Sequence, residues 1–261
     1  MRTLNGRRVL VTRPREQAGV LMRLLSEGGG EPVLFPALEI RAPAHPEALE
    51  ATMLDLSRFD LAIFISPTAV EYGLRYAIAA GPWPEHVKVA AVGPGGATAL
   101  AAAGIKNVIV PATRFDSEGL LDKLAKMTYL TYRNVLIFRG GGGRELLATE
   151  LKRRGAEVAL AECYERAKPS TDGAPVIAMW REGRLDAITV TSSEAVDNLV
   201  EMLGDAGREL LAVTPIFAPH PRIIERAQWR GALKAQLTTA GDKGLVDGIQ
   251  SFFAKVTRLS K

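Results

Sequence analysis

Short apolar runs alternate along the chain with longer stretches whose apolar positions recur at helical spacing. Residues 61–65 are an unbroken apolar run, which is typical of a parallel strand buried on both faces. Residues 15–27 follow a helical pattern that the glycines at 28–30 end. The alternation predicts an α/β fold with parallel sheets flanked by helices. Further strands are expected at 9–11, 33–35, 87–92, 108–110, 135–138, 187–190 and 213–217, and further helices at 66–79, 144–154, 193–203 and 244–255.

The chain also repeats itself at a constant offset. The segments RVLVTR and NVLIFR match, as do SPTAV and SSEAV, and Gly29 matches Gly155. The offset is 126 in each case (134 − 8, 192 − 66 and 155 − 29). A register kept over three segments indicates a duplication, and therefore two similar α/β units. Segments 35–43 and 162–169 occupy equivalent places in the two copies. Both are extended and bounded by proline, so we interpret them as connections between domains.

Composition excludes several classes of protein. Apolar residues are 47% and charged residues 24% of the 261, as in folded globular domains. The single Cys163 excludes an internal disulfide and a cysteine metal cluster, and the three histidines lack zinc-site spacing. The chain has no apolar run long enough to span a bilayer, and its first residues do not resemble a signal peptide. We therefore expect a reduced, cytoplasmic setting and no membrane association.

The net charge of +4 favours anionic partners. The basic residues form no long runs and aromatics are 6%, so we expect no nucleic-acid partner. A small polyanionic ligand fits this charge better.

Strand-to-helix turns are the places where an anion is expected to bind, because free N–H groups of helix N-termini lie there. Arg13, Ser66 and Ser192 occupy three such turns. For both serines, simple helix capping is an open alternative. The fourth turn holds glycines 140–143 between Arg139 and Arg144, where a bare backbone and two guanidinium groups suit an oxyanion. A flexible surface loop is the alternative there.

Other candidate residues have weaker support. The turns at Gly140 and Gly93 fail the dinucleotide pattern because Glu145 and Thr98 replace its last glycine, and no phosphate-binding loop sequence is present. Tyr164 offers a phenolic proton if it faces a cleft, and is otherwise a packing residue. His220 is either a turn residue or a ligand-binding residue.

Several of these motifs together resemble the uroporphyrinogen-III synthase family. The resemblance runs over nearly the whole chain. It rests on VLVTRP from position 9, FISPTAV from 64, AVGPG from 91, DSEGLL from 116, RG at 139–140 with GRE at 143–145, YER from 164, TSSEAV from 191 and TAGD from 239.

The resemblance implies two α/β lobes joined by a two-stranded linker, with the active site in the cleft between them. Carried over to this chain, one lobe is residues 1–36 plus 169–261 and the other is 42–162. The linker strands are then 37–41 and 163–168. Neither 126-residue copy is then a lobe by itself.

The implied reaction is cyclisation of hydroxymethylbilane, a linear tetrapyrrole, to uroporphyrinogen III in heme biosynthesis. Water is lost, and the last pyrrole ring is inverted through a spiro intermediate. The family requires no metal and no organic cofactor. We expect a monomer whose partner is this polycarboxylate substrate. A catalytic nucleophile is not required, because the substrate itself supplies the reactive azafulvene and pyrrole.

The family's linker tyrosine matches Tyr164, which we expect to be the catalytic acid. Its cleft serine matches Ser66, with Ser192 the counterpart in the other lobe. The chain departs from the family where Gly96 replaces a threonine and where His220 and Arg222 replace a threonine pair. The substrate-binding residues we expect are Arg13, Ser66, Gly96, Arg139, Gly141, Arg144, Ser192, His220 and Arg222. A non-catalytic two-lobed sensor or carrier of a small polyanion is the alternative function, and a nucleotide-dependent enzyme is a third reading.

Overall fold

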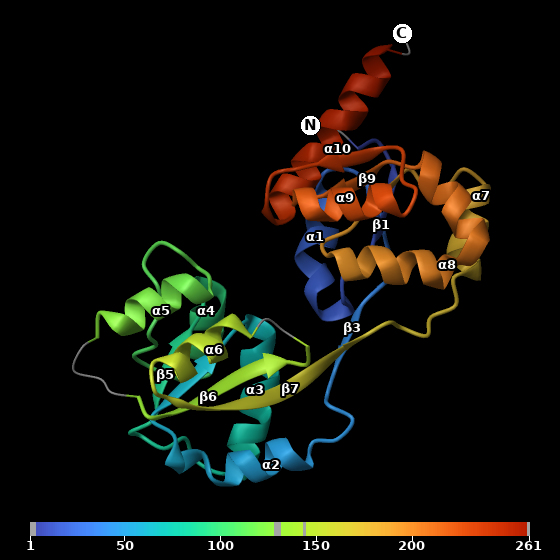
Figure 1. The fold of residues 1–261 in the computed structure, drawn as a ribbon. Helices are drawn as coiled ribbons and strands as arrows, with labels where there is room; N and C mark the ends of the chain where they lie inside the picture. Colours follow the sequence, from blue (N-terminus) through green and yellow to red (C-terminus); the bar gives the residue numbers. More distant parts are fainter. Residues whose placement is uncertain (1–3, 128–131, 143–144, 260–261) are drawn as a thin grey trace. The chain divides into compact units, whose positions relative to one another are not determined.

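The chain forms two compact units, each with its own sheet. The computed structural model describes residues 4–127, 132–142 and 145–259. Unit 1 comprises Met1–Glu39 with Ala167–Lys261, and unit 2 comprises Ile40–Arg166. Each unit contains a five-stranded sheet with helices on both faces (Figure 1).

Unit 1 has the strand order β10-β9-β8-β1-β2, and its strand pairs are parallel. Alternate residues of β1 face opposite layers. Val9 and Val11 pack with α1 and α10, whereas Leu10 packs with α7, α8 and α9. The strands are β1 (Arg8–Val11), β2 (Glu31–Leu34), β8 (Ala187–Thr189), β9 (Ile216–Ala218) and β10 (Ala235–Leu237). The helices are α1 (Arg15–Glu27), α7 (Ala174–Arg181), α8 (Ser193–Val213), α9 (Pro221–Trp229) and α10 (Gly241–Leu259).

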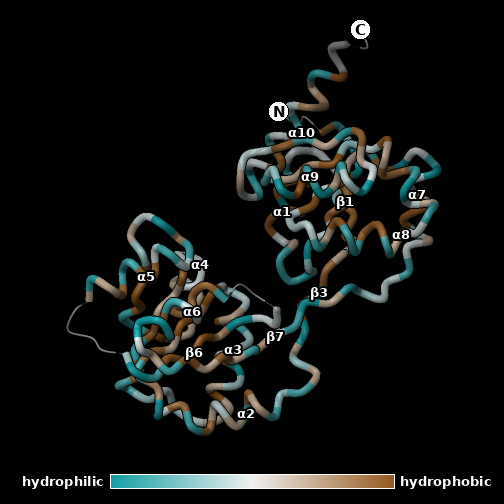
Figure 2. The backbone as a smooth tube through the Cα atoms, viewed as in Figure 1, coloured by the Kyte–Doolittle hydropathy of each residue, from teal (hydrophilic) through white to brown (hydrophobic). Residues whose placement is uncertain are grey.

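Unit 2 has the strand order β3-β7-β6-β4-β5, in which β5, β4, β6 and β7 are parallel. The rings of Phe64 and Phe138 stack between the sheet and α3, with their centroids 4.3 Å apart. Apolar residues line the interior of each unit (Figure 2). The strands are β3 (Glu39–Arg41), β4 (Leu61–Phe64), β5 (Lys88–Ala91), β6 (Asn134–Gly140) and β7 (Glu157–Ala167). The helices are α2 (Glu47–Leu54), a short 3-10 turn (Leu56–Arg58), α3 (Pro67–Ala80), α4 (Pro94–Ala102), α5 (Ser117–Ala125) and α6 (Leu146–Arg153).

The two sheets are built alike, as the duplication predicts. Offset by 126 residues, β1 corresponds to β6 (134 − 8), β2 to β7 (157 − 31) and β4 to β8 (187 − 61). Ile109, which bridges Ala90, takes the place of β10 (235 − 109). The order β2-β1-β8-β9-β10 in unit 1 thus repeats as β7-β6-β4-β5-Ile109 in unit 2. Each unit combines the first half of one copy with the second half of the other.

Most predicted elements are present, and two differ for identifiable reasons. The predicted strand at 108–110 is wrong, because Ile109 makes one isolated bridge to Ala90 instead of a ladder. The predicted strand at 213–217 begins only at Ile216, since α8 continues to Val213 after a break at Gly204. Gly204 has φ 60, a left-handed conformation that glycine tolerates. The helix predicted over 193–203 is therefore the first part of a longer one.

The second predicted linker segment contributes to a sheet. Residues of β7 pair with β6 as far as Tyr164, so Cys163 and Tyr164 belong to the sheet of unit 2. Both are buried in its core. The sequence predicted the extended conformation of these residues, but it did not predict that they pair with β6.

Candidate functional site

The carboxyl ends of three parallel strands of unit 2 meet at one edge of its sheet. Ser66 follows β4, residues 93–96 follow β5, Gly140 ends β6, and Gly141 comes directly after it. We call this set the carboxyl edge of unit 2. Polar groups at such an edge are well placed for a ligand, because helix N-termini point their N–H groups toward it.

Ser66 is the N-cap of α3. Its Oγ accepts a hydrogen bond from the Ala69 N–H at 3.1 Å, and Pro67 occupies the first helical position. The capping interpretation is therefore confirmed for Ser66. The same hydroxyl also lies 3.4 Å from the Tyr164 hydroxyl, so capping is not its sole contact.

Tyr164 projects from β7 into the unit 2 core, with 2% of its surface exposed. The centroid of its ring lies 5.9 Å from the centroid of the Tyr72 ring, and its hydroxyl faces Ser66. The expectation of a tyrosine on a separate linker segment needs correction, because the ring is packed within one unit. Its hydroxyl end nevertheless reaches the carboxyl edge, and the residue lines a pocket there.

This pocket has a volume of about 400 Å³. Its ionisable lining residues are Glu162, His45 and Glu165. The Ala44 N–H donates to the Glu165 carboxylate at 2.9 Å, and with Arg41 and His45 nearby it lowers the pKa of that carboxyl. The lining residues are Pro43, His45, Ala48, Leu49, Thr52, Gly141, Leu160, Glu162, Tyr164 and Glu165.

Two helix N-termini lie beside each other at this edge. A Cβ added to Gly95 of α4 would be 3.2 Å from Pro67 of α3. A Cβ added to Gly96 would be 3.2 Å from the Ala91 Cβ and 4.0 Å from the Ser66 carbonyl carbon. Gly96 is buried, and the lack of a side chain at this position lets α4 lie close to Ser66. Gly93 is the N-cap of α4. It has no side chain, so it offers the N–H groups in the first turn of α4 no side-chain acceptor. These N–H groups suit a ligand oxyanion.

The glycine-rich turn differs from its predicted role. Arg139 is 4% exposed, and its Nε donates to the Gly140 carbonyl at 3.2 Å, so its guanidinium is turned into the protein. The Gly141 N–H donates to the Tyr164 carbonyl at 3.1 Å and thus continues the sheet. The prediction that Arg139 and the Gly141 N–H face a ligand is not supported by this geometry. Arg144 lies outside the described residues.

The other predicted residues lie at the carboxyl ends of strands in unit 1. Arg13 follows β1 and forms an ion pair with Asp242 in the first turn of α10, so an anion must compete with that carboxylate. Ser192 caps α8, accepting from the Ala195 N–H at 3.0 Å. His220 caps α9 through Nδ1, which accepts from the Arg222 N–H at 3.2 Å, and both are exposed.

Unit 2 thus brings together Ser66, Gly96 and Tyr164. Sequence reasoning missed Tyr72, Glu165 and His45, which lie near the same tyrosine. Their signal was weak, since Tyr72 is an ordinary helical aromatic and His45 stands alone in a loop.

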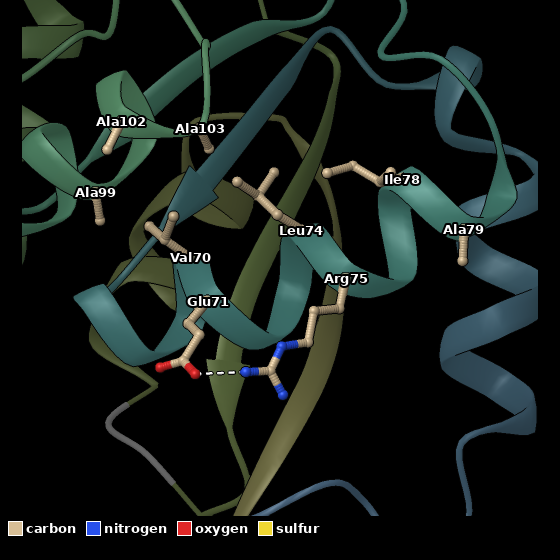
Figure 3. Close-up of a pocket in the computed structure, with 9 residues that line it drawn as sticks. All are labelled: Val70, Glu71, Leu74, Arg75, Ile78, Ala79, Ala99, Ala102 and Ala103. Atoms are coloured by element: carbon tan, nitrogen blue, oxygen red, sulfur yellow. Dashed lines mark hydrogen bonds and ion pairs between the residues drawn. The ribbon is translucent and has the colours of Figure 1, made fainter. Parts of the chain in front are cut away.

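A second cavity lies away from the carboxyl edge, in a groove between α3 and α4 (Figure 3). It measures about 770 Å³ and its lining is almost entirely apolar. Glu71 and Arg75 at its rim pair with each other at 2.5 Å. Because the other residues that line it are apolar, this groove suits a polyanion poorly.

Within the described residues, no three His, Cys, Asp or Glu side chains are grouped as a metal site requires. None of the described helices has the length and apolar character needed to cross a bilayer.

Replacing Ser192 with alanine is expected to lower the unfolding free energy by about 1 kcal/mol. The Ala195 N–H would lose its acceptor at the start of α8. Urea unfolding measures the cost. Ser193→Ala, at the next position, removes a hydroxyl that is not the cap and should cost less than about 0.5 kcal/mol. Equal costs for the two variants would contradict the capping geometry.

Cys163 is expected to be unreactive in the native protein. Burial raises the pKa of its thiol to about 12, and the residue is fully buried. Because the thiolate is the reactive form, alkylation by iodoacetamide at pH 8 requires local opening of unit 2. Mass spectrometry should show labelling in denaturant at least roughly 1,000-fold faster than in buffer. Rapid native labelling would contradict the placement of β7.

Comparisons with known proteins agree with this fold. Residues 19–241 match the family model described as "Uroporphyrinogen-III synthase HemD". A uroporphyrinogen-III synthase of Salmonella typhimurium is 32% identical over 192 residues, covering 73% of this chain and 78% of that protein. One of Escherichia coli is 31% identical over 202 residues, covering 77% and 82%. A solved uroporphyrinogen III synthase of Thermus thermophilus shares the fold, with a TM-score of 0.59, 20% identity, and coverage of 97% and 100%.

Proposed function

The chain belongs to the uroporphyrinogen-III synthase family, and from that premise we propose that it cyclises hydroxymethylbilane to uroporphyrinogen III. The observation that carries the assignment of the site is the Tyr164 hydroxyl, 3.4 Å from Ser66 at the carboxyl edge of unit 2. The family match favours this enzyme over the non-catalytic sensor or carrier.

Tyr164 donates a proton to the terminal hydroxyl of the substrate, which leaves as water. The remaining azafulvenium cation is attacked by the substituted carbon of the last pyrrole, giving the spiro intermediate from which that ring is inverted. Closing the macrocycle releases one proton, which returns to the phenolate. Ser66, hydrogen-bonded to the α3 backbone, holds its hydroxyl beside the phenol. Such positioned acid catalysis is typically worth about 100-fold to 10,000-fold in rate.

The substrate's acid arms bind to backbone N–H groups at the starts of α3 and α4. Two adjacent helix N-termini are favourable for carboxylates, and Gly95 and Gly96 keep side chains out of the way. In unit 1, Ser192, His220 and Arg222 at the starts of α8 and α9 serve the same purpose. Arg13 contributes once a substrate carboxylate displaces Asp242.

The pocket beside Tyr164 has a different chemistry. Its carboxylates, Glu162 and Glu165, repel acid arms, so the arms are directed to the helix N-termini instead. Each tenfold preference for the inverted product over uncatalysed closure requires about 1.4 kcal/mol of barrier difference. Holding a flexible chain in one geometry can lower the barrier by several times this amount.

The direct test is to incubate the protein with hydroxymethylbilane and separate the uroporphyrinogen isomers. We expect isomer III to predominate, against isomer I in a reaction without protein. Isomer I alone would refute the proposal. Tight binding of a polyanion without any turnover would instead support the non-catalytic alternative.

We further propose that the enzyme works as a cytoplasmic monomer without cofactor or nucleic acid. Its modest charge of +4 supports a small anionic partner. Sedimentation at micromolar concentration should give the mass of one chain, and dialysis against chelator should leave turnover unchanged. A stable dimer or a loss of activity after dialysis would contradict this.

A further inference from the structure

The placement of Tyr164 depends on an irregularity in the sheet. Arg139 of β6 pairs with Glu162 of β7, but the next residue, Gly140, pairs with Tyr164, so the register shifts by one residue. Cys163 is the extra residue of this β-bulge. Regular alternation would turn Cys163 and Tyr164 to opposite faces of the sheet, yet both pack in the same core cluster, against α3. The bulge turns the Tyr164 ring inward, toward α3 and Ser66.

Gly140 provides the space that the ring occupies. A Cβ at this position would lie 2.4 Å from Cε2 and 2.6 Å from Cζ of Tyr164. Cζ carries the hydroxyl, so the contact falls on the end of the ring that faces Ser66. Gly140 is not among the glycines with positive φ, so its backbone conformation is open to other residues. The neighbouring ring is what requires glycine here.

The duplication supplies an internal comparison. At the offset of 126, Gly140 corresponds to Pro14 (140 − 14) and Tyr164 to Leu38 (164 − 38). Ser66 corresponds to Ser192, and both serines cap helices with the same geometry. The serine is thus present in both units, whereas the phenol is present only where a glycine faces it.

We propose that Gly140 is a positioning residue for the reaction: its missing side chain lets the Tyr164 hydroxyl reach the Ser66 hydroxyl. This proposal rests on the proposed function of Tyr164 as the acid. A methyl group at position 140 must push the ring by about 1 Å to restore ordinary contact distances near 3.5 Å. A misplacement of that size costs about 100-fold in rate when the displaced group takes part in the chemistry.

The test compares Gly140→Ala with Gly119→Ala. Gly119 also lies in unit 2, and a Cβ there would be 2.0 Å from the Arg114 carbonyl oxygen, away from Tyr164. Both variants should lose stability. Gly140→Ala should lower kcat by 10-fold to 100-fold with KM within about 3-fold, whereas the folded fraction of Gly119→Ala should keep its kcat. Equal kcat values for the two variants would overturn the proposal.

A stability cycle with Tyr164→Leu checks the same contact without reference to activity. Leucine, the residue of unit 1, removes Cε2 and Cζ, so the destabilisation by Gly140→Ala should be clearly smaller in that background. If Gly140→Ala alone does not fold, recovery of folding in the Tyr164→Leu background tests the same contact. Additive effects would overturn the proposal. If the wild-type protein yields isomer I alone, the proposed function fails, and the stability cycle still reports on the contact.

Discussion

Tyr164→Phe is expected to lower kcat by about 100-fold, with an unfolding free energy within about 1 kcal/mol of wild type. The ring packing against Tyr72 is retained, and the hydroxyl's contact with Ser66 is long, at 3.4 Å. What is lost is the proton that assists departure of the substrate hydroxyl. Single-turnover rates with hydroxymethylbilane and urea unfolding measure the two quantities.

Tyr76→Phe is a matched control for this variant. Tyr76 also lies on the core side of unit 2, on α3, where burial raises the pKa of its phenol. Because it is more than two turns from the helix N-terminus, its loss should leave kcat unchanged. If Tyr164→Phe keeps the wild-type rate, Tyr164 is not the acid, even if isomer III is formed.

Ser66→Asp is expected to raise KM by at least about tenfold over Ser66→Asn. Both residues are good N-caps of similar size, so each preserves the start of α3. They differ by one negative charge at the place where two helix N-termini meet. That charge would occupy the donors proposed for a substrate carboxylate and repel the remaining acid arms.

Salt dependence separates this charge effect from a steric one. Added salt screens exposed charges, so the ratio of the two KM values should shrink between about 0.05 and 0.5 M salt. Equal KM values for Ser66→Asp and Ser66→Asn at low salt would show that acid arms bind elsewhere.

The overall fold was predictable because its signals are local or repeated. The helix at 15–27 has a clear apolar period and glycines at its end, and the structure confirms it as α1. The constant 126-residue offset predicted two similar units. Two predictions failed. At 108–110 a short apolar run did not show that strand pairing stops after one bridge. At 213–217 it did not show that the preceding helix continues past Gly204 to Val213.

The site was less predictable because it depends on pairing and packing. Ser66 was found by its place after a buried strand and before Pro67. For Arg139, the sequence does not show that the side chain turns back toward Gly140 and away from solvent. The burial of Tyr164 follows from a bulge opposite Gly140, and the spacing of apolar residues in β7 does not reveal that shift.

The account's central claim is that substrate carboxylates bind at the carboxyl edge of unit 2, beside Tyr164. Amide chemical shifts recorded during titration with uroporphyrinogen III test it most directly. We predict the largest changes at Ser66, Gly95 and Gly96. Changes confined to the opposite end of the same strands, at Asp60 and Lys88, with the three amides unmoved, would contradict the claim.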